Sequence, residues 1–384
     1  MNNEWFYNFN IPLKKIILFE SKPDYSDNTY AVYQEMLKEK LNKDFKFVWI
    51  VNDKSKYKDI KIKNVKFINK NSKGFDRLKI SYYRHFAQFI IDSNDYIKKL
   101  NKNQFRIFLT HGAFIKVPMI YGKDCGEADV IASLSNYFSK INKECYCQKN
   151  DNSLAIGFPR NDALFEKCDK KIFEEIPYNK LIVWLPTYRN HKAFSSDDNK
   201  HYMNIVFNFG IPVIENENEL LDLNQKLVEK KEILIVKLHP AEDDSKIKKM
   251  CLSNIKLIDD DWLKKNDITL YQLLEKSDAL ITDYSSVYYD YLLTEKMIGI
   301  AAPDINEYRK NVELLFDDME SNIPGEYIYT YIDLLNFFDN VSTGNDLKYE
   351  ERKEKINLYH RYNDGNSAKR VIELVKKISN GGKK

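Results

Sequence analysis

Two adjacent serines follow a short apolar run in the second half of the sequence and could bind an anion. The run Ala279–Ile281 leads into Thr282 and Asp283. After one tyrosine come Ser285 and Ser286, ahead of an aromatic-rich segment. If the run is a buried strand and the segment a helix, the serines lie at a helix N-terminus, where free N–H groups and the helix dipole favour negative charge. One serine is enough to cap a helix. The additional hydroxyls favour a phosphate site.

Two of the six histidines also follow apolar runs directly. His111 comes after FRIFLT, and His239 follows ILIVKL, two residues after Lys237. Imidazole is the side chain that changes charge near neutral pH. A lone histidine at a strand end is usually structural, whereas two at corresponding positions favour chemistry in which one accepts a proton and the other holds a phosphate.

Two arginines add fixed positive charge. Arg160 lies in GFPRND and Arg189 in PTYR, and a guanidinium matches phosphate oxygens in bidentate fashion. Arg160 could instead pair with Asp162 and fix a turn. A Mg²⁺ site would need gathered carboxylates, but only Asp283 and Asp290 lie near these motifs. We therefore expect a pyrophosphate-bearing ligand and no metal.

Strand-like and helix-like segments alternate along the chain, which is typical of βαβ units with parallel sheets. Strand patterns are KKIILFE, FKFVWIV, VKFIN, FIIDS, FRIFLT and DVIASL, then LIVWLP, ILIVKLHP, IKLID, ALITD and MIGIAA. A charged stretch with Pro177 separates the two groups. The sequence predicts an α/β protein with two doubly wound Rossmann-type domains, 1–174 and 175–384, facing a central cleft. The final helix NSAKRVIELVKKIS would cross back to the first domain.

The polar motifs fall at the carboxyl ends of these expected strands, where open α/β sheets bind ligands. The sequence contains no GxGxxG after the first strand and no GxxxxGK[ST], which argues against ordinary dinucleotide binding and against a P-loop ATPase.

Composition limits the class of protein further. The 384 residues are 43% apolar, and the apolar runs are too short to span a bilayer. We expect a cytoplasmic protein that could be peripheral on the membrane, with reduced cysteines: Cys125, Cys145, Cys147, Cys168 and Cys251. Residues 1–120 hold 23 Lys and Arg against 12 Asp and Glu. This excess could face anionic lipid or an anionic acceptor, although a solvated lysine-rich surface explains most of it. We expect no nucleic-acid partner.

Taken together in their order and spacing, the motifs resemble the CDP-glycerol glycerophosphotransferases, which make teichoic acid and related poly(alditol phosphate) polymers of bacterial envelopes and capsules. The resemblance covers nearly the whole chain and rests on FESKPDYSDN, THGAF, GFPRND, LPTYR, KLHP, TDYSSVYYDYL, EYR at 307–309 and HRYNDG at 360–365. It implies a GT-B-like pair of domains, with the acceptor approaching the first and a CDP-alditol held mainly by the second.

Carried over to this sequence, the resemblance implies that His111 is the general base and His239 a second catalytic residue in the donor site. The donor-site residues it implies are Arg160, Pro186, Thr187, Lys237, Ser285, Ser286 and Asp290. Arg189 joins them on charge, Thr282 as part of the serine motif, and Gly112 as the neighbour of His111. Two departures from the family pattern are Thr110, where Trp is usual, and AFIK in place of TPLK after the His-Gly pair.

The expected activity is transfer of glycerol phosphate or ribitol phosphate from CDP-glycerol or CDP-ribitol to a hydroxyl of a lipid-linked or polymeric acceptor, with release of CMP. No cofactor beyond this donor is expected. Chain length favours a priming or short-chain enzyme. The alternatives are a GT-B glycosyltransferase or epimerase using a UDP-sugar, and a non-catalytic nucleotide-binding scaffold of an envelope-assembly complex.

Overall fold

The computed structural model describes residues 12–71, 73–94, 97–117, 128–146, 150–189, 205 and 207–382. By its contacts the chain divides into two compact units, each described by itself below. Unit 1 comprises Met1–Ala113, Pro118–Asp162 and Leu358–Lys384, and unit 2 comprises Phe114–Val117 and Ala163–Asn357. The sequence-based boundary lies at 174/175, whereas the change from unit 1 to unit 2 falls between Asp162 and Ala163.

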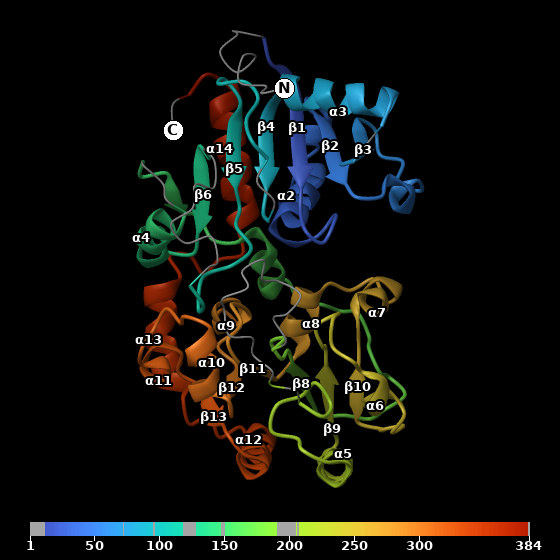
Figure 1. Ribbon diagram of the computed structural model, residues 1–384, viewed down its shortest axis with the longest axis vertical. Helices are drawn as coiled ribbons and strands as arrows, with labels where there is room; N and C mark the ends of the chain where they lie inside the picture. The colour runs from blue at the N-terminus through green and yellow to red at the C-terminus, as the bar shows by residue number, and fades with distance from the viewer. Residues whose placement is uncertain are drawn as a thin grey trace. The chain divides into compact units, whose positions relative to one another are not determined.

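Unit 1 is built on a seven-stranded parallel sheet in the order β3-β2-β1-β4-β5-β6-β7 (Figure 1). Reversal of strand order between β1 and β4 is the switch point of a doubly wound sheet, beside which such folds bind ligands. Its strands are β1 Lys14–Glu20, β2 Lys46–Val51, β3 Val65–Asn69, β4 Ala87–Asp92, β5 Phe105–Phe108, β6 Val130–Ser133 and β7 Ser153–Ala155.

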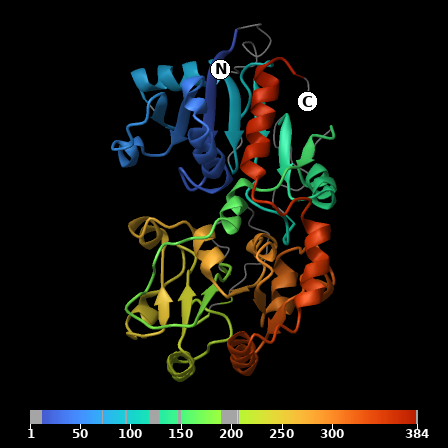
Figure 2. The same ribbon diagram turned by 180° about the vertical axis from the view of Figure 1, so that it is seen from behind.

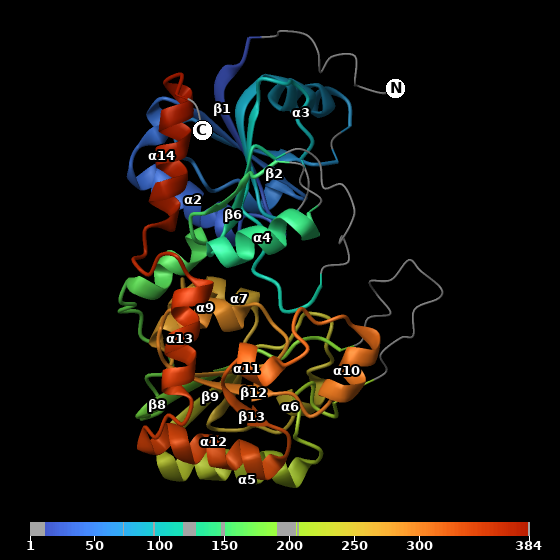
Figure 3. The same ribbon diagram turned by 90° about the vertical axis from the view of Figure 1, so that its left-hand side faces the viewer.

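The helices of unit 1 cover both faces of this sheet. They are α2 Asp27–Lys38, α3 Phe75–Phe86, α4 Asn136–Cys145 and α14 Ser367–Ser379, with the 3-10 segments η1 Leu41–Lys43 and η2 Lys54–Tyr57. The final helix α14 lies beside α2 (Figures 2 and 3), burying Val371 and Val375 and pairing Lys376 with Glu39. The prediction that this helix returns to the first domain is confirmed.

Unit 2 repeats the same topology with six parallel strands in the order β10-β9-β8-β11-β12-β13. Its switch point lies between β8 and β11. The strands are β8 Lys180–Trp184, β9 Glu232–Val236, β10 Ile255–Leu257, β11 Ala279–Thr282, β12 Met297–Ala301 and β13 Glu326–Ile328. Strands β9 and β11 are buried along their full length and β8 in all but its first residue, as their continuous apolar runs predict.

The helices of unit 2 include the short, aromatic-rich helix that the sequence predicts after the paired serines. They are α5 Glu217–Lys230, α6 Ser245–Lys248, α7 Asp260–Lys265, α8 Leu270–Lys276, α9 Val287–Leu292, α10 Ile305–Asn311, α11 Met319–Asn322 and α12 Tyr331–Thr343; α13 Tyr349–Tyr359 leads to unit 1. Every residue of α9 is buried. The 3-10 segment η3, Pro159–Phe165, spans the change of unit at Asp162/Ala163.

The strand patterns read from the sequence omit β7 and β13, although the run LAI of β7 was read as the strand end before GFPRND, and each group is one strand short of its sheet. Each of these two strands has three residues, which is too short for either a period of two or a clear apolar run to stand out. Within the described residues, no helix combines the length and hydropathy that crossing a membrane requires.

Candidate functional site

In unit 1, three strand ends bring His111, Asp27 and Arg160 together. His111 lies three residues after β5, Asp27 follows β1 and begins α2, and Arg160 lies in the 3-10 segment η3 after β7. His111 Nδ1 lies 2.8 Å from Asp27 Oδ2, and Arg160 Nη1 donates to Asp27 Oδ1 at 2.7 Å. The carboxylate and the guanidinium are nearly buried, whereas the imidazole is 67% exposed. A buried ion pair thus supports an exposed histidine.

The charge state of Asp27 fixes the tautomer of His111. Burial alone would raise the pKa of Asp27, but the charge of Arg160 and the hydrogen bond from His111 hold it at about 2. The ionised carboxylate only accepts hydrogen bonds, so Nδ1 of His111 carries the hydrogen that it donates. Nε2 then has a lone pair and can accept a proton.

The backbone around this histidine is held by Asn28, a fully buried side chain. Its Nδ2 donates to the Thr110 carbonyl at 3.1 Å, and its Oδ1 accepts from the Arg160 N–H at 3.1 Å. Asp27 and Thr110 both adopt a left-handed backbone, with φ of 59° and 56°. Asp tolerates this conformation, but it is unfavourable for a β-branched residue such as Thr110, and strain of this kind clusters at functional sites.

Sequence reasoning assigned no role to Asp27 or Asn28, although both close the motif FESKPDYSDN. A signal was available there, because the loop that follows the first strand of a doubly wound sheet lies at its switch point, and this polar pair ends that loop and begins α2. The structure also overturns the alternative in which Arg160 pairs with Asp162. Asp162 instead accepts the N–H groups of Ser367 and Ala368 and caps α14.

In unit 2, the carboxylate of Asp283 is the centre of a buried polar network after β11. It accepts the backbone N–H of Thr187 at 2.9 Å, the N–H of Tyr284 at 2.6 Å and Nη1 of Arg189 at 2.7 Å. The hydroxyl of Thr187 also donates to it. Asp283 therefore fixes the segment after β8 against the segment after β11.

Arg189 is committed to two carboxylates. Besides Asp283, its Nε donates to Asp304 at 2.7 Å, and its guanidinium lies over the rings of Tyr284 and Tyr308. Burial would lower the pKa of Arg189, but both carboxylates raise it well above its usual range. Since the side chain is buried with two negative partners, its charge is already balanced.

His239 lies three residues after β9, and β9 is the strand next to β8. Its ring stacks on Tyr188 with centroids 4.9 Å apart, and its Nδ1 accepts the Ala241 N–H at 3.2 Å. Burial and the charges of Lys237 and Lys116 lower the pKa of His239. The neutral ring therefore carries its hydrogen on Nε2, so that Nε2 is a donor. Lys237 itself pairs with half-exposed Asp260 at 3.0 Å.

Lys116 is a third residue that sequence reasoning missed, after Asp27 and Asn28. The segment Phe114–Val117 joins unit 2 through Tyr289 Oη to the Phe114 carbonyl and through backbone hydrogen bonds with residues 313–315. No carboxylate of a described residue lies within 4 Å of its Nζ. Burial lowers the pKa of Lys116, Asp283 raises it and Arg189 lowers it. The sequence signal was present, because the lysine of the usual TPLK pattern is retained in AFIK.

The remaining predicted residues fall into two groups. Thr282 and Asp290 are fully buried: Thr282 donates to the Leu185 carbonyl at 3.3 Å and Asp290 accepts from Tyr271 Oη at 2.6 Å. Residues at least partly accessible at strand ends are Gly112 in unit 1 and Pro186, Ser285 and Ser286 in unit 2. Ser286 is at the N-cap of α9 as predicted, but its side chain makes no capping hydrogen bond.

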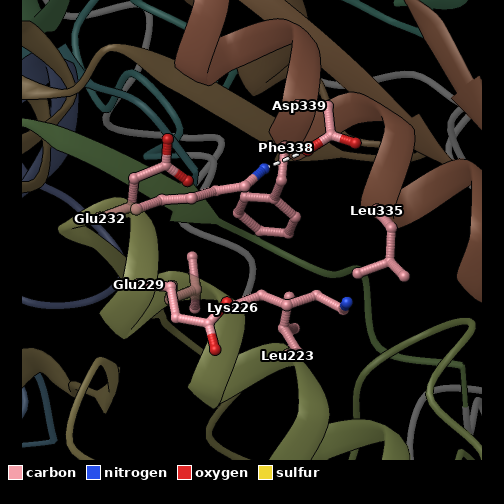
Figure 4. Close-up of a pocket in the computed structure, with 9 residues that line it drawn as sticks. Leu223, Lys226, Glu229, Glu232, Leu335, Phe338 and Asp339 are labelled. Atoms are coloured by element: carbon pink, nitrogen blue, oxygen red, sulfur yellow. Dashed lines mark hydrogen bonds and ion pairs between the residues drawn. The ribbon is translucent and has the colours of Figure 1, made fainter.

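A cavity of about 180 Å³ in unit 2 lies away from these residues, between α5 and α12 (Figure 4). Leu223, Leu227, Leu335 and Phe338 line it together with charged residues, and none of the predicted site residues does.

No described group of three or more His, Cys, Asp or Glu side chains could hold a metal ion. Cys145, Cys168 and Cys251 are free thiols. Cys125 and Cys147 lie outside the described residues.

Two doubly wound parallel sheets, each with polar side chains at the carboxyl ends of its strands, define an α/β protein with a GT-B-like fold. The chain belongs to the family described as CDP-Glycerol:Poly(glycerophosphate) glycerophosphotransferase, whose model matches residues 6–377. The resemblance seen in the motifs is thereby confirmed.

The chain is also similar in sequence to curated proteins of teichoic acid synthesis. The teichoic acid poly(glycerol phosphate) polymerase of Bacillus spizizenii is 23% identical over 393 residues, covering 94% of this chain and 91% of that protein. Alignments with three other curated relatives cover 57% to 59% of those proteins, and 65%, 66% and 95% of this chain.

Solved structures support the fold. The wall teichoic acid polymerase TagF matches with a TM-score of 0.70 and 22% identity, over 95% of this chain and 89% of that chain. A UDP-N-acetylglucosamine 2-epimerase matches with a TM-score of 0.55 and 13% identity, over 97% and 98%. The fold alone therefore does not select the donor nucleotide.

Proposed function

We propose that this protein transfers glycerol phosphate or ribitol phosphate from the matching CDP-alditol to a hydroxyl of a lipid-linked or polymeric acceptor, with release of CMP. Family membership makes the donor class the leading candidate. The single observation that carries the chemistry is the exposed imidazole of His111, oriented by Asp27 with Nε2 available to accept a proton.

The chemical step is assigned to His111 as general base. The acceptor oxygen attacks the phosphorus that bears the alditol, and its proton passes to Nε2 of His111. The bond from that phosphorus to the CMP oxygen breaks, and the electron pair leaves with CMP. A phosphodiester forms on the acceptor. A positioned base of this kind contributes typically 10²- to 10⁴-fold, and most of the remaining acceleration in phosphoryl transfer comes from positioning and electrostatics.

The donor diphosphate is assigned to unit 2. Several hydrogen-bond donors lie near the ends of the adjacent strands β9, β8 and β11. They are Nε2–H of His239, the ammonium group of Lys237, and the hydroxyls of Ser285 and Ser286. The ammonium group of Lys116 adds a further donor from the segment Phe114–Val117. Negative charge builds on the transferring phosphoryl group and on CMP, so cations and neutral donors at these positions would stabilise the transition state.

Arg189, Thr282 and Asp290 receive positioning roles in this proposal. Each is buried and already paired within unit 2. Arg189 and Asp283 hold Thr187 and Pro186 after β8, which would line the nucleotide in unit 2. Gly112 and Arg160, beside His111 in unit 1, are also assigned to substrate binding.

The proposed base His111 and Lys116 are close in sequence. His111 and Lys116 are five residues apart, and five extended residues span at most roughly 18 Å between Cα atoms. The proposed base and a candidate phosphate-binding lysine therefore lie on one short segment of the chain.

The acceptor and the location complete the proposal. A lipid-linked acceptor places the enzyme in the cytoplasm, peripheral on the inner face of the membrane. Glycerol and ribitol donors differ by only a few hydroxyls, and the proposal includes both.

Thermal stability with added nucleotides tests the donor class. A ligand at 100 times its Kd stabilises the native state by about 2.7 kcal/mol, so CDP-glycerol or CDP-ribitol should raise the Tm well above the shift from an equal concentration of UDP-sugar. A shift with UDP-N-acetylglucosamine alone would favour the glycosyltransferase or epimerase alternative. The absence of a shift with every CDP-alditol would contradict the proposal.

A further inference from the structure

One edge of the unit 1 sheet carries a dense group of cations. Between residues 54 and 79, ten side chains are Lys or Arg and two are Asp, and all ten cations are exposed. We call the surface formed by these ten the β3 edge: Lys54, Lys56, Lys58, Lys61, Lys63, Lys66, Lys70, Lys73, Arg77 and Lys79.

These residues belong to elements that pack together. Strand β3 is the terminal strand of the sheet, η2 precedes it and α3 follows it (Figure 1). Lys54 of η2 bonds Asp76 of α3 at 2.7 Å through Nζ, and its N–H donates to Asn69 at the end of β3 at 2.6 Å. The cations therefore share one margin of unit 1.

Within the described residues, half of these ten cations form no ion pair with a carboxylate along one continuous run. Asp76 accepts both Lys54 and Lys79, and Lys70 pairs with Glu20. No carboxylate of a described residue lies within 4 Å of the Nζ atoms in the run between η2 and β3, which are those of Lys56, Lys58, Lys61, Lys63 and Lys66. Lysine also protects an edge strand from pairing with another chain, but only Lys66 lies on β3, so edge protection does not account for the rest.

Apolar side chains are exposed among these cations. Leu78 is 65% exposed, Tyr82 39% and Ile62 36%. Near an anionic bilayer each lysine contributes about 1 kcal/mol, and apolar side chains on an amphipathic helix enter the boundary between headgroups and acyl chains. A polyanion in solution would match the charges but would leave Leu78 and Ile62 in water, so the combination favours lipid.

The β3 edge also lies near the proposed reaction centre within unit 1. Both η2 and His111 follow the carboxyl ends of strands in the same parallel sheet, η2 after β2 and His111 after β5. In the order β2-β1-β4-β5 these strands are three steps apart, which is roughly 14 Å at the usual strand spacing. A lipid-anchored molecule at this edge would be within reach of His111.

We propose that the β3 edge binds the anionic surface of a lipid bilayer and thereby presents unit 1 to a membrane-anchored acceptor. The second half of this statement rests on the proposed function. The first half, lipid binding, does not.

Vesicle sedimentation tests the binding. The full chain is mixed with vesicles of phosphatidylcholine alone, or of phosphatidylcholine with about 30% phosphatidylglycerol, which gives a strongly anionic surface. The bound fraction is measured at rising salt. Wild type should bind only the anionic vesicles and should be released by salt. The variant Lys56→Glu, Lys58→Glu, Lys61→Glu, Lys63→Glu should bind at least about ten-fold more weakly.

A matched control separates this surface from net charge. Lys98, Lys102, Lys369 and Lys377 are also exposed lysines of unit 1, and replacing these four with Glu changes the net charge equally. This control should retain wild-type binding. An equal loss in both variants, or tighter binding of wild type to soluble poly(glycerol phosphate) than to the vesicles, would overturn the proposal.

Catalysis separates this proposal from the proposed function. With a water-soluble acceptor analogue, the β3-edge variant should turn over CDP-alditol at the wild-type rate. Loss of vesicle binding with unchanged turnover supports a membrane role for this surface. Turnover absent in wild type but with intact vesicle binding would contradict the proposed function alone.

Discussion

The two histidines at strand ends are alike in sequence and opposite in chemistry. Each lies three residues after a central strand, but His111 donates from Nδ1 to an ionised carboxylate, whereas His239 accepts a backbone N–H at Nδ1. Nε2 is therefore a proton acceptor in His111 and a hydrogen-bond donor in His239. The partner of Nδ1, and not the position at a strand end, decides what each ring can do.

The two arginines likewise differ in the partners of their guanidinium groups. Arg160 and Arg189 both contact aspartates, but Arg160 shares Asp27 with an exposed histidine, whereas Arg189 is buried between Asp283 and Asp304. The first ion pair orients a reactive group. The second fixes the backbone that surrounds the site.

Replacing His111 should have the largest effect on turnover. In His111→Asn the proton acceptor is lost while a polar group remains beside Asp27, so CMP release should fall by about 10²- to 10⁴-fold with an unchanged melting curve. The matched control is His85→Asn on α3, which should keep full activity. A His111→Asn enzyme with more than about a tenth of the wild-type rate would remove the base from the account.

Replacing the two arginines sharpens the second comparison. Arg189→Met leaves two buried carboxylates without their cation, and losing one partner of a buried pair typically costs 3 to 5 kcal/mol. Arg160→Met leaves Asp27 with His111 and should cost less. Urea unfolding of both variants measures this difference, and equal or reversed losses would contradict the structural role of Arg189.

The carboxylate of Asp27, which orients His111, should also make the stability of the fold depend on pH. Its pKa is about 2 in the folded protein against 3.8 ordinarily, so the ionised form contributes about 2 kcal/mol above pH 4. Because the folded pKa is depressed, this contribution is present above the unfolded pKa and is lost as pH falls toward 2. Asp27→Asn should be less stable at pH 7, and its difference from wild type should narrow below pH 4. A difference that does not change with pH would indicate that the carboxylate is not responsible.

Lys116 should give the smallest effect, mostly on donor binding. If its ammonium contacts the donor phosphates, Lys116→Met should raise the KM for CDP-alditol about ten-fold, which corresponds to one lost charge-assisted hydrogen bond, and should leave kcat nearly unchanged. Lys310→Met, on exposed α10, is the control. An unchanged KM would assign Lys116 to packing alone.

Much of the fold could be predicted from local patterns, because buried parallel strands are written as continuous apolar runs. The strands β1, β9 and β11 and the final helix α14 were all recognisable in this way. The three-residue strand β13 was not, and β7 showed only as the short run LAI, since the pairing of such short strands is set by neighbouring strands.

The site could be predicted only in part, for a related reason. His111 and His239 are marked by their positions after apolar runs. The partner of His111 is 84 residues away in sequence, and only the strand order brings Asp27 beside it. Charge likewise suggested Arg189 as a phosphate ligand, but its two carboxylate partners come from segments about 100 residues later.

Product analysis tests the central claim most directly. Purified protein is incubated with labelled CDP-glycerol or CDP-ribitol and a lipid-linked acceptor, and nucleotide release and label transfer are quantified together. The account predicts one CMP released for each alditol phosphate joined to the acceptor, with both products lost in His111→Asn. Release of UDP from a UDP-sugar, or donor binding without any transfer, would contradict it.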